Sequence, residues 1–174
     1  MAVAGDVLAE VAPGRTPPSS VRETGKPPWR LRVEEDELAA RLPGVVAAEA
    51  NAVGDGRLAV IVPGARLREL GRLLAEAVPG ASAEQGPAAL DARVAVLTVA
   101  AAKGLEFDGV VVVDPAGILG EAAHGGTDLY VALTRSTQRL GVVHTGDLPP
   151  MLARLRPIEE VPAEDATVEE AAAE

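Results

Sequence analysis

Hydrophobic residues of this chain gather in short continuous runs, which are separated by stretches with helical periodicity. Four of these runs have the length of a β-strand and are apolar at nearly every position: residues 58–62, 94–99, 110–113 and 140–144. A further short segment, residues 29–33, alternates apolar and basic side chains, as a strand does. Strands that are apolar on both faces are typical of a mostly parallel sheet covered by helices, so the pattern predicts an α/β fold.

The stretches between these strands predict helices. In residues 66–78 apolar side chains recur on one side, and Pro79-Gly80 ends the segment. The side that we expect to face inward consists of Leu67, Leu70, Leu73, Leu74 and Val78. Four further segments are predicted to be helical, namely residues 3–11, 34–51, 128–134 and 149–155.

The pattern also predicts how the chain is organised. Residues 1–30 hold the end of a helix and a proline-rich connection, which contains the segment Ser-Val-Arg-Glu-Thr-Gly at residues 20–25. Residues 31–157 contain the alternating strands and helices and are predicted to form one domain. Residues 158–174 are rich in alanine, glutamate and proline, and we expect them to be a disordered tail.

Composition narrows the chemistry that is open to this domain. The core must be aliphatic, because the chain has one Phe, one Trp and one Tyr. It has no cysteine, which excludes disulfides and thiolate chemistry, and two histidines are too few for most histidine-based metal sites. No apolar run approaches the roughly 20 residues of a membrane span, and the N-terminus lacks the pattern of an export signal. We therefore expect a cytoplasmic protein with no membrane partner and no resident metal.

The net charge of −10 is concentrated at one end of the chain. Seven of the 26 acidic residues lie from Glu159 onward, where there is no basic residue. The other residues carry 16 basic and, by subtraction, 19 acidic side chains, a net charge of −3. Strong nucleic-acid binding depends mainly on neutralising phosphates, so any such contact must be local.

Two polar segments adjoin the predicted strands, where ligands of open α/β sheets are expected at the carboxyl ends. Residues 98–108 connect the second and third apolar strands, and residues 129–135 precede the fourth. Gly104 permits backbone conformations that a Cβ forbids, Glu106 offers a carboxylate, and Arg135 offers a planar cation suited to phosphate oxygens. Taken singly, each has an ordinary alternative: a turn, a solvated carboxylate and a cation that complements a helix C-terminus.

The combination of the two segments is more specific. Lys-Gly-Leu-Glu-Phe-Asp at residues 103–108 resembles motif V of UvrD/Rep-type superfamily 1 helicases. Leu-Tyr-Val-Ala-Leu-Thr-Arg-Ser-Thr-Gln at residues 129–138 resembles their motif VI, and the order is the same. The sequence of residues 102–116, together with the segment at residues 20–25, most resembles that of the HelD branch. Members of this branch are RNA-polymerase-associated motor ATPases of Gram-positive bacteria. The resemblance implies a RecA-like second motor domain.

The resemblance also implies roles for individual residues. Arg135 matches the motif VI arginine that reaches across a domain interface to the γ-phosphate of ATP and acts as an arginine finger. Lys103, Gly104 and Glu106 match motif V positions beside the nucleotide, with Glu106 as the ribose contact. Thr98 matches a motif V threonine near the nucleic-acid strand. Tyr130 and Gln138, which lie within motif VI, are expected to be structural or interface residues.

Other parts of the family pattern are missing from the sequence. There is no Gly-x-x-x-x-Gly-Lys-Ser/Thr loop to hold phosphates and no Asp-Glu pair after an apolar run to hold Mg²⁺. Many family members have a histidine two residues after the motif V threonine, whereas this chain has Ala100, which weakens the expected nucleic-acid contact. Motif IV would precede Val3, so we expect the chain to begin within a helix that follows it and Met1 to be an internal methionine of a longer protein.

These observations lead to one main expectation and two alternatives. The main one is a second motor domain of an ATP-dependent DNA helicase or translocase, HelD-like and acting on RNA polymerase. Its ATP site, with Mg²⁺, would be completed by an N-terminal RecA-like domain, so this chain alone would not hydrolyse ATP. The alternatives are a non-enzymatic module that binds RNA polymerase or another protein, and a decayed helicase fragment. The acidic tail would mimic nucleic acid or keep the chain soluble.

Overall fold

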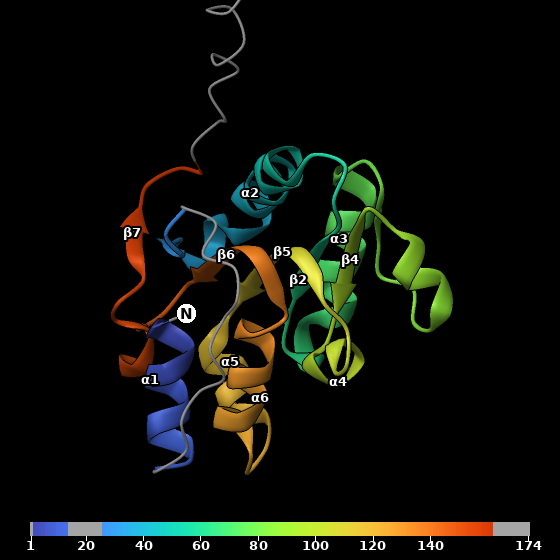
Figure 1. Ribbon diagram of the computed structural model, residues 1–174. Helices are drawn as coiled ribbons and strands as arrows, with labels where there is room; N and C mark the ends of the chain where they lie inside the picture. Colours follow the sequence, from blue (N-terminus) through green and yellow to red (C-terminus); the bar gives the residue numbers. More distant parts are fainter. Residues whose placement is uncertain (1, 14–25, 162–174) are drawn as a thin grey trace, which may run out of the picture.

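The computed structural model describes residues 2–13 and 26–161, and Figure 1 shows a central sheet with helices packed against it. The segment at residues 20–25 and residues 162–174 of the predicted tail (residues 158–174) lie outside the described residues. The sheet has seven strands in the order β3-β4-β2-β5-β6-β1-β7, and all six neighbouring pairs are parallel. The strands are β1 (Trp29–Arg32), β2 (Leu58–Ile61), β3 (Ala81–Ser82), β4 (Val94–Leu97), β5 (Phe107–Val113), β6 (Ser136–His144) and β7 (Arg156–Ile158). The predicted α/β fold with a mostly parallel sheet is confirmed.

Helices cover the sheet on both faces, because the central strands are apolar on both. Alternate residues of β2 point to opposite sides, so that Leu58 and Val60 join one core cluster while Ala59 and Ile61 join the other. The first cluster lies under α2 (Leu38–Val53) and α3 (Leu67–Ala77). The second lies under α1 (Ala2–Val11), α4 (Val99–Ala102), α5 (Pro115–Glu121) and α6 (Gly125–Leu133). Short 3-10 turns complete the elements: η1 (Glu35–Glu37), η2 (Gly64–Arg66), η3 (Pro87–Asp91) and η4 (Pro150–Leu152).

The long predicted helices are confirmed with small shifts at their ends. The prediction over residues 34–51 corresponds to η1 followed by α2, and that over residues 66–78 corresponds to α3. Of the five residues that were predicted to face inward, Leu70, Leu74 and Val78 are buried. Leu67 and Leu73 are half-buried and pack against the core. An amphipathic period of this kind depends on local sequence alone, which is why it was predictable.

The end of the described chain differs from expectation. Residues 149–155 were predicted to form a short helix, but only η4 forms there, and the chain then enters β7. The backbone N–H of Arg156 donates to the carbonyl of Pro28 at 3.1 Å, which draws this segment into the sheet beside β1. Pro157 has no N–H to donate, and it is tolerated because β7 is an edge strand.

One buried ion pair joins the helical layer to the sheet. Glu49 of α2 is fully buried and accepts two hydrogen bonds from Arg139 of β6, from Nε at 3.0 Å and from Nη2 at 2.8 Å. The indole Nε1 of Trp29 on β1 donates to the same carboxylate at 3.2 Å. Trp29 lies beside Gly141 in the register of β1 and β6, where a Cβ would overlap the indole ring. The charged carboxylate is thereby satisfied in an otherwise apolar layer.

Within residues 2–13 and 26–161, no helix combines the length and the apolar character that crossing a bilayer requires.

Candidate nucleotide-facing edge

The predicted site residues lie at two opposite edges of the sheet rather than together. Thr98 directly follows β4 and lies at the carboxyl edge of the parallel strands. Lys103, Gly104 and Glu106 directly precede β5, and Arg135 directly precedes β6, so all four lie at the amino edge. The expectation that both polar segments lie at carboxyl ends is therefore wrong for these four residues. The physical reason is that the chain must return to the amino edge before each new parallel strand begins.

The segment between β4 and β5 makes this crossing with a short helix and a turn. The hydroxyl of Thr98 accepts a hydrogen bond from the backbone N–H of Ala101 at 3.3 Å, and it thereby caps α4. The turn follows at Gly104, whose φ of +80° lies in the left-handed region. Apart from Gly104 and its two chain neighbours, no atom of the described residues lies within 4 Å of the place where a Cβ would stand, so the backbone conformation, not crowding, favours glycine here.

The two exposed charges of this segment have different surroundings. The Nζ of Lys103 lies 3.5 Å from Oδ1 of Asp128 on α6, which ties the turn to that helix. Glu106 is exposed, and among the residues that the structure describes, its carboxylate has no hydrogen-bond or ion-pair partner. A carboxylate that is free at an edge can accept from a hydroxyl of an incoming ligand.

Arg135 lies beside the turn, where the starts of β5 and β6 meet. The backbone N–H of Phe107 donates to the carbonyl of Arg135 at 2.9 Å. The guanidinium of Arg135 is half-buried, and its Nη1 donates to the carbonyl of Leu105 at 3.2 Å. The structure therefore places Arg135 against the segment of Gly104 and Glu106, although the two motifs are far apart in the sequence.

The other motif residues support the edge structurally. The side chain of Gln138 donates to Oδ1 of Asp108 at 3.0 Å, and Oδ2 of Asp108 accepts from the backbone N–H of Arg57 at 2.8 Å. The guanidinium of Arg57 lies 5.6 Å from the centre of the Phe107 ring. Tyr130 is half-buried and packs against the core. These contacts fasten the start of β5 to the starts of β2 and β6.

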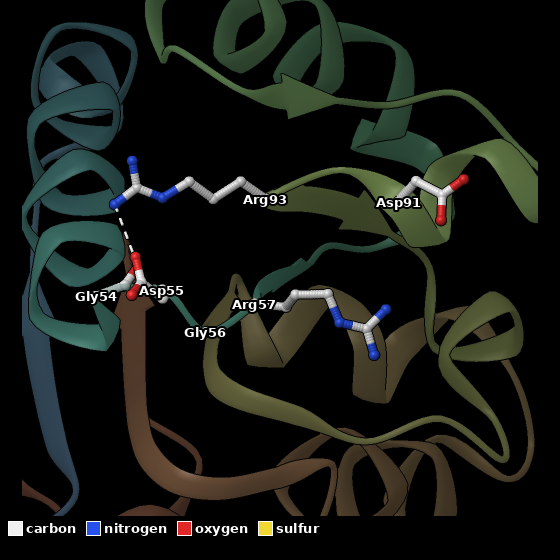
Figure 2. Close-up of a pocket in the computed structure, with 6 residues that line it drawn as sticks. All are labelled: Gly54, Asp55, Gly56, Arg57, Asp91 and Arg93. Atoms are coloured by element: carbon white, nitrogen blue, oxygen red, sulfur yellow. Dashed lines mark hydrogen bonds between the residues drawn. The ribbon is translucent and has the colours of Figure 1, made fainter.

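A pocket that the sequence did not predict opens at the same amino edge, before β2 and β4 (Figure 2). Its volume is about 520 Å³, and it is lined by Gly54, Asp55, Gly56, Arg57, Asp91 and Arg93. The two arginines and two aspartates cancel in charge. Figure 2 shows the guanidinium groups pointing in opposite directions. Arg93 donates to the carbonyl of Gly54 at 3.3 Å and Arg57 to that of Leu90 at 2.6 Å, so the pair does not form a clamp for an anion.

The carboxyl edge carries a charge cluster that the sequence pattern also missed. Glu35 forms a close ion pair with Arg66, at 2.6 Å, and Arg66 also lies 3.9 Å from Asp114. A hydrogen bond from the side chain of Thr145 and the pairing with Arg66 hold the pKa of Glu35 below its ordinary value of 4.5. Asp114 has a positive φ of 54° and caps α5 by accepting from the N–H of Gly117. The acidic side chains make this edge a poor surface for phosphates near β1, β2 and β5.

No group of three or more histidine, aspartate or glutamate side chains is arranged to hold a metal ion within the described ranges.

Comparison with known proteins agrees with the two motifs and with the fold. Residues 93–143, which contain both motif segments, β4, β5 and all of β6 except its last residue, match the model of the UvrD-like helicase C-terminal domain. No curated protein gives a significant match to the chain. Among solved structures, the C-terminal domain of a possible DNA helicase from Lactobacillus plantarum WCFS1 is similar, with a TM-score of 0.61 and 22% identity. The match covers 88% of this chain and 91% of that one. The fold is thus that of a helicase C-terminal, RecA-like domain, and residues 93–143 have the sequence pattern of UvrD-like helicases.

Proposed function

We propose that this chain is the second motor domain of an ATP-dependent helicase or translocase, and that its amino edge forms half of an ATP site. The observation that carries the proposal is the gathering of Lys103, Gly104, Glu106 and Arg135 at one edge, with Thr98 at the other. A motor domain must bind its nucleotide and its nucleic acid at separate surfaces of one rigid domain. The segment of residues 98–106 connects the two edges directly.

The residues of the amino edge fit a nucleotide in chemical type. Arg135 supplies a planar cation for phosphate oxygens, Glu106 supplies a free carboxylate for a sugar hydroxyl, and the open space beside Gly104 permits a close approach of the backbone. ATP with Mg²⁺ would supply the phosphoanhydride bond whose hydrolysis drives movement. A phosphate-binding loop and Mg²⁺ ligands are missing from this sequence, so a second RecA-like domain would provide them.

We place the nucleic-acid contact at Thr98 on the carboxyl edge. Its hydroxyl is half-buried and already accepts from Ala101, so it has a hydrogen to donate to a phosphate oxygen. Ala100 beside it is exposed but offers no polar or aromatic group. A single hydroxyl donor, at an edge where the cation of Arg66 is already paired with Glu35, supports only a weak DNA contact.

The absence of a phosphate loop leads to a prediction for the purified chain. Alone, it is expected to release no phosphate from ATP above the background. Half of an ATP site cannot hold the phosphates of ATP and the attacking water in position together. The measurement is phosphate release with Mg²⁺ by the 174-residue chain and by an Arg135→Ala preparation made in parallel. ATP hydrolysis by the original chain that is lost in Arg135→Ala would contradict the proposal that this chain forms only half of an ATP site.

The resemblance to the HelD branch supports RNA polymerase as the partner. We expect purified bacterial RNA polymerase to be retained by the immobilised chain, and to be retained equally after deletion of residues 159–174, whose role would be solubility. The measurement is a pull-down with both forms and with bare resin. Retention that is lost with residues 159–174 would favour the alternative of an interaction module that mimics nucleic acid. No retention by either form would contradict the HelD-like role.

A further inference from the structure

The guanidinium of Arg135 is bound within its own domain at three nitrogens. Its Nε donates to the carbonyl of Val131 at 3.2 Å, its Nη1 to the carbonyl of Leu105 at 3.2 Å, and its Nη2 to the hydroxyl oxygen of Thr134 at 3.3 Å. The acceptors come from two segments, the end of α6 and the turn before β5. The orientation of the guanidinium is therefore set by the relative position of the two motifs.

Thr134 supplies the one side-chain oxygen among these three acceptors. Its hydroxyl lies 3.0 Å from the carbonyls of both Tyr130 and Val131, to which it can donate its hydrogen, so its lone pairs remain available to Arg135. The backbone N–H of Thr134 already binds the same two carbonyls, at 3.1 and 3.2 Å. The hydroxyl is thus not needed to close the end of α6, and its distinctive contact is the one with Arg135.

We propose that Thr134 is a positioning residue for Arg135. Its hydroxyl oxygen and the carbonyl of Leu105 each hold one Nη group, so the guanidinium is kept from rotating about its Nε–Cζ bond and stays at the amino edge. Each Nη group carries a second N–H, so a phosphate oxygen can engage Arg135 while these bonds hold its guanidinium in place. This orientation reduces the entropy lost when the cation binds its ligand. The consequence for turnover rests on the proposed function, whereas the restraint itself does not.

The restraint can be measured in the 174-residue chain without nucleotide or partner. Rotation about the Nε–Cζ bond of Arg135 exchanges its two Nη nitrogens, and its rate is obtained by nitrogen NMR, with the signal assigned by its loss in Arg135→Lys. Thr134→Val is expected to speed the rotation about tenfold, because a hydrogen bond from a charged group is lost. Thr134→Ser, which keeps the hydroxyl, is expected to rotate at the original rate.

The matched control is Thr137→Val. The hydroxyl of Thr137 donates to the carbonyl of Phe107 at 3.3 Å, so this variant loses a similar bond at the start of β6. Its rotation rate is expected to equal that of the original chain. Should Thr134→Val not fold, as judged by circular dichroism, Thr134→Ala serves in its place.

Two results would overturn the proposal: an unchanged rate in Thr134→Val, or equal acceleration in Thr137→Val, which would indicate general loosening of the strand start. A faster rotation that is specific to Thr134→Val and restored in Thr134→Ser supports it. The outcome is separable from the proposed function, since a normal ATP turnover in an Arg135→Ala motor would refute the arginine finger while leaving the measured restraint in place.

Discussion

Arg135→Ala, made in a complete two-domain motor that contains this chain, is expected to lower ATP turnover by about 10³- to 10⁵-fold. The reason is that an arginine finger stabilises the charge that develops on the transferred phosphate in the transition state, and alanine removes that cation entirely. Nucleotide affinity should fall much less, because the proposed second domain would provide most ground-state contacts with the phosphates. The measurement is steady-state hydrolysis together with equilibrium binding of a labelled nucleotide.

Two controls separate catalysis from structure. Arg135 also binds the carbonyl of Leu105, so its loss could disturb the turn before β5. Arg135→Lys keeps the charge but lacks the planar fork, and it is expected to recover only part of the turnover. Arg72→Ala removes an exposed arginine of α3 that pairs with Glu76, and it should leave turnover unchanged. Turnover of Arg135→Ala within a few fold of the original would exclude the arginine-finger role.

The largest expected effect on stability comes from Glu49→Ala. It leaves Arg139, whose side chain is only 11% exposed, without the carboxylate that accepts two of its hydrogen bonds. Breaking a buried ion pair at one partner typically costs about 3–5 kcal/mol, because the remaining charge loses the carboxylate that compensated it. We expect the free energy of unfolding in urea, followed by circular dichroism, to fall by about this amount.

Two further variants identify the source of this loss. The double variant Glu49→Leu with Arg139→Met replaces the pair by apolar groups and should recover most of the stability, because no buried charge remains. Trp29→Phe removes the neutral indole donor to Glu49 together with part of a buried ring and should cost less than Glu49→Ala. A loss below about 1 kcal/mol in Glu49→Ala would mean that the carboxylate does not hold α2 against β6.

The central strands and the long helices were predictable because their signals are local. Continuous apolar runs, such as the four valines of residues 110–113, require burial on both faces, and the period of α3 identifies the side that faces the sheet. The short elements were not predictable. β3 has two residues and β7 contains a proline, so both exist as strands only because a neighbouring strand offers hydrogen-bond partners.

The candidate site, too, was predictable from the sequence only in part. Residue types and order alone identify Gly104, Glu106 and Arg135 as candidates, because the two motifs are contiguous stretches of sequence. Only the tertiary structure places these residues at the amino edge and Thr98 at the carboxyl edge, since edge position follows from strand direction and pairing. The contact of Arg135 with Leu105 likewise arises where the starts of β5 and β6 meet, and no local pattern encodes a meeting of that kind.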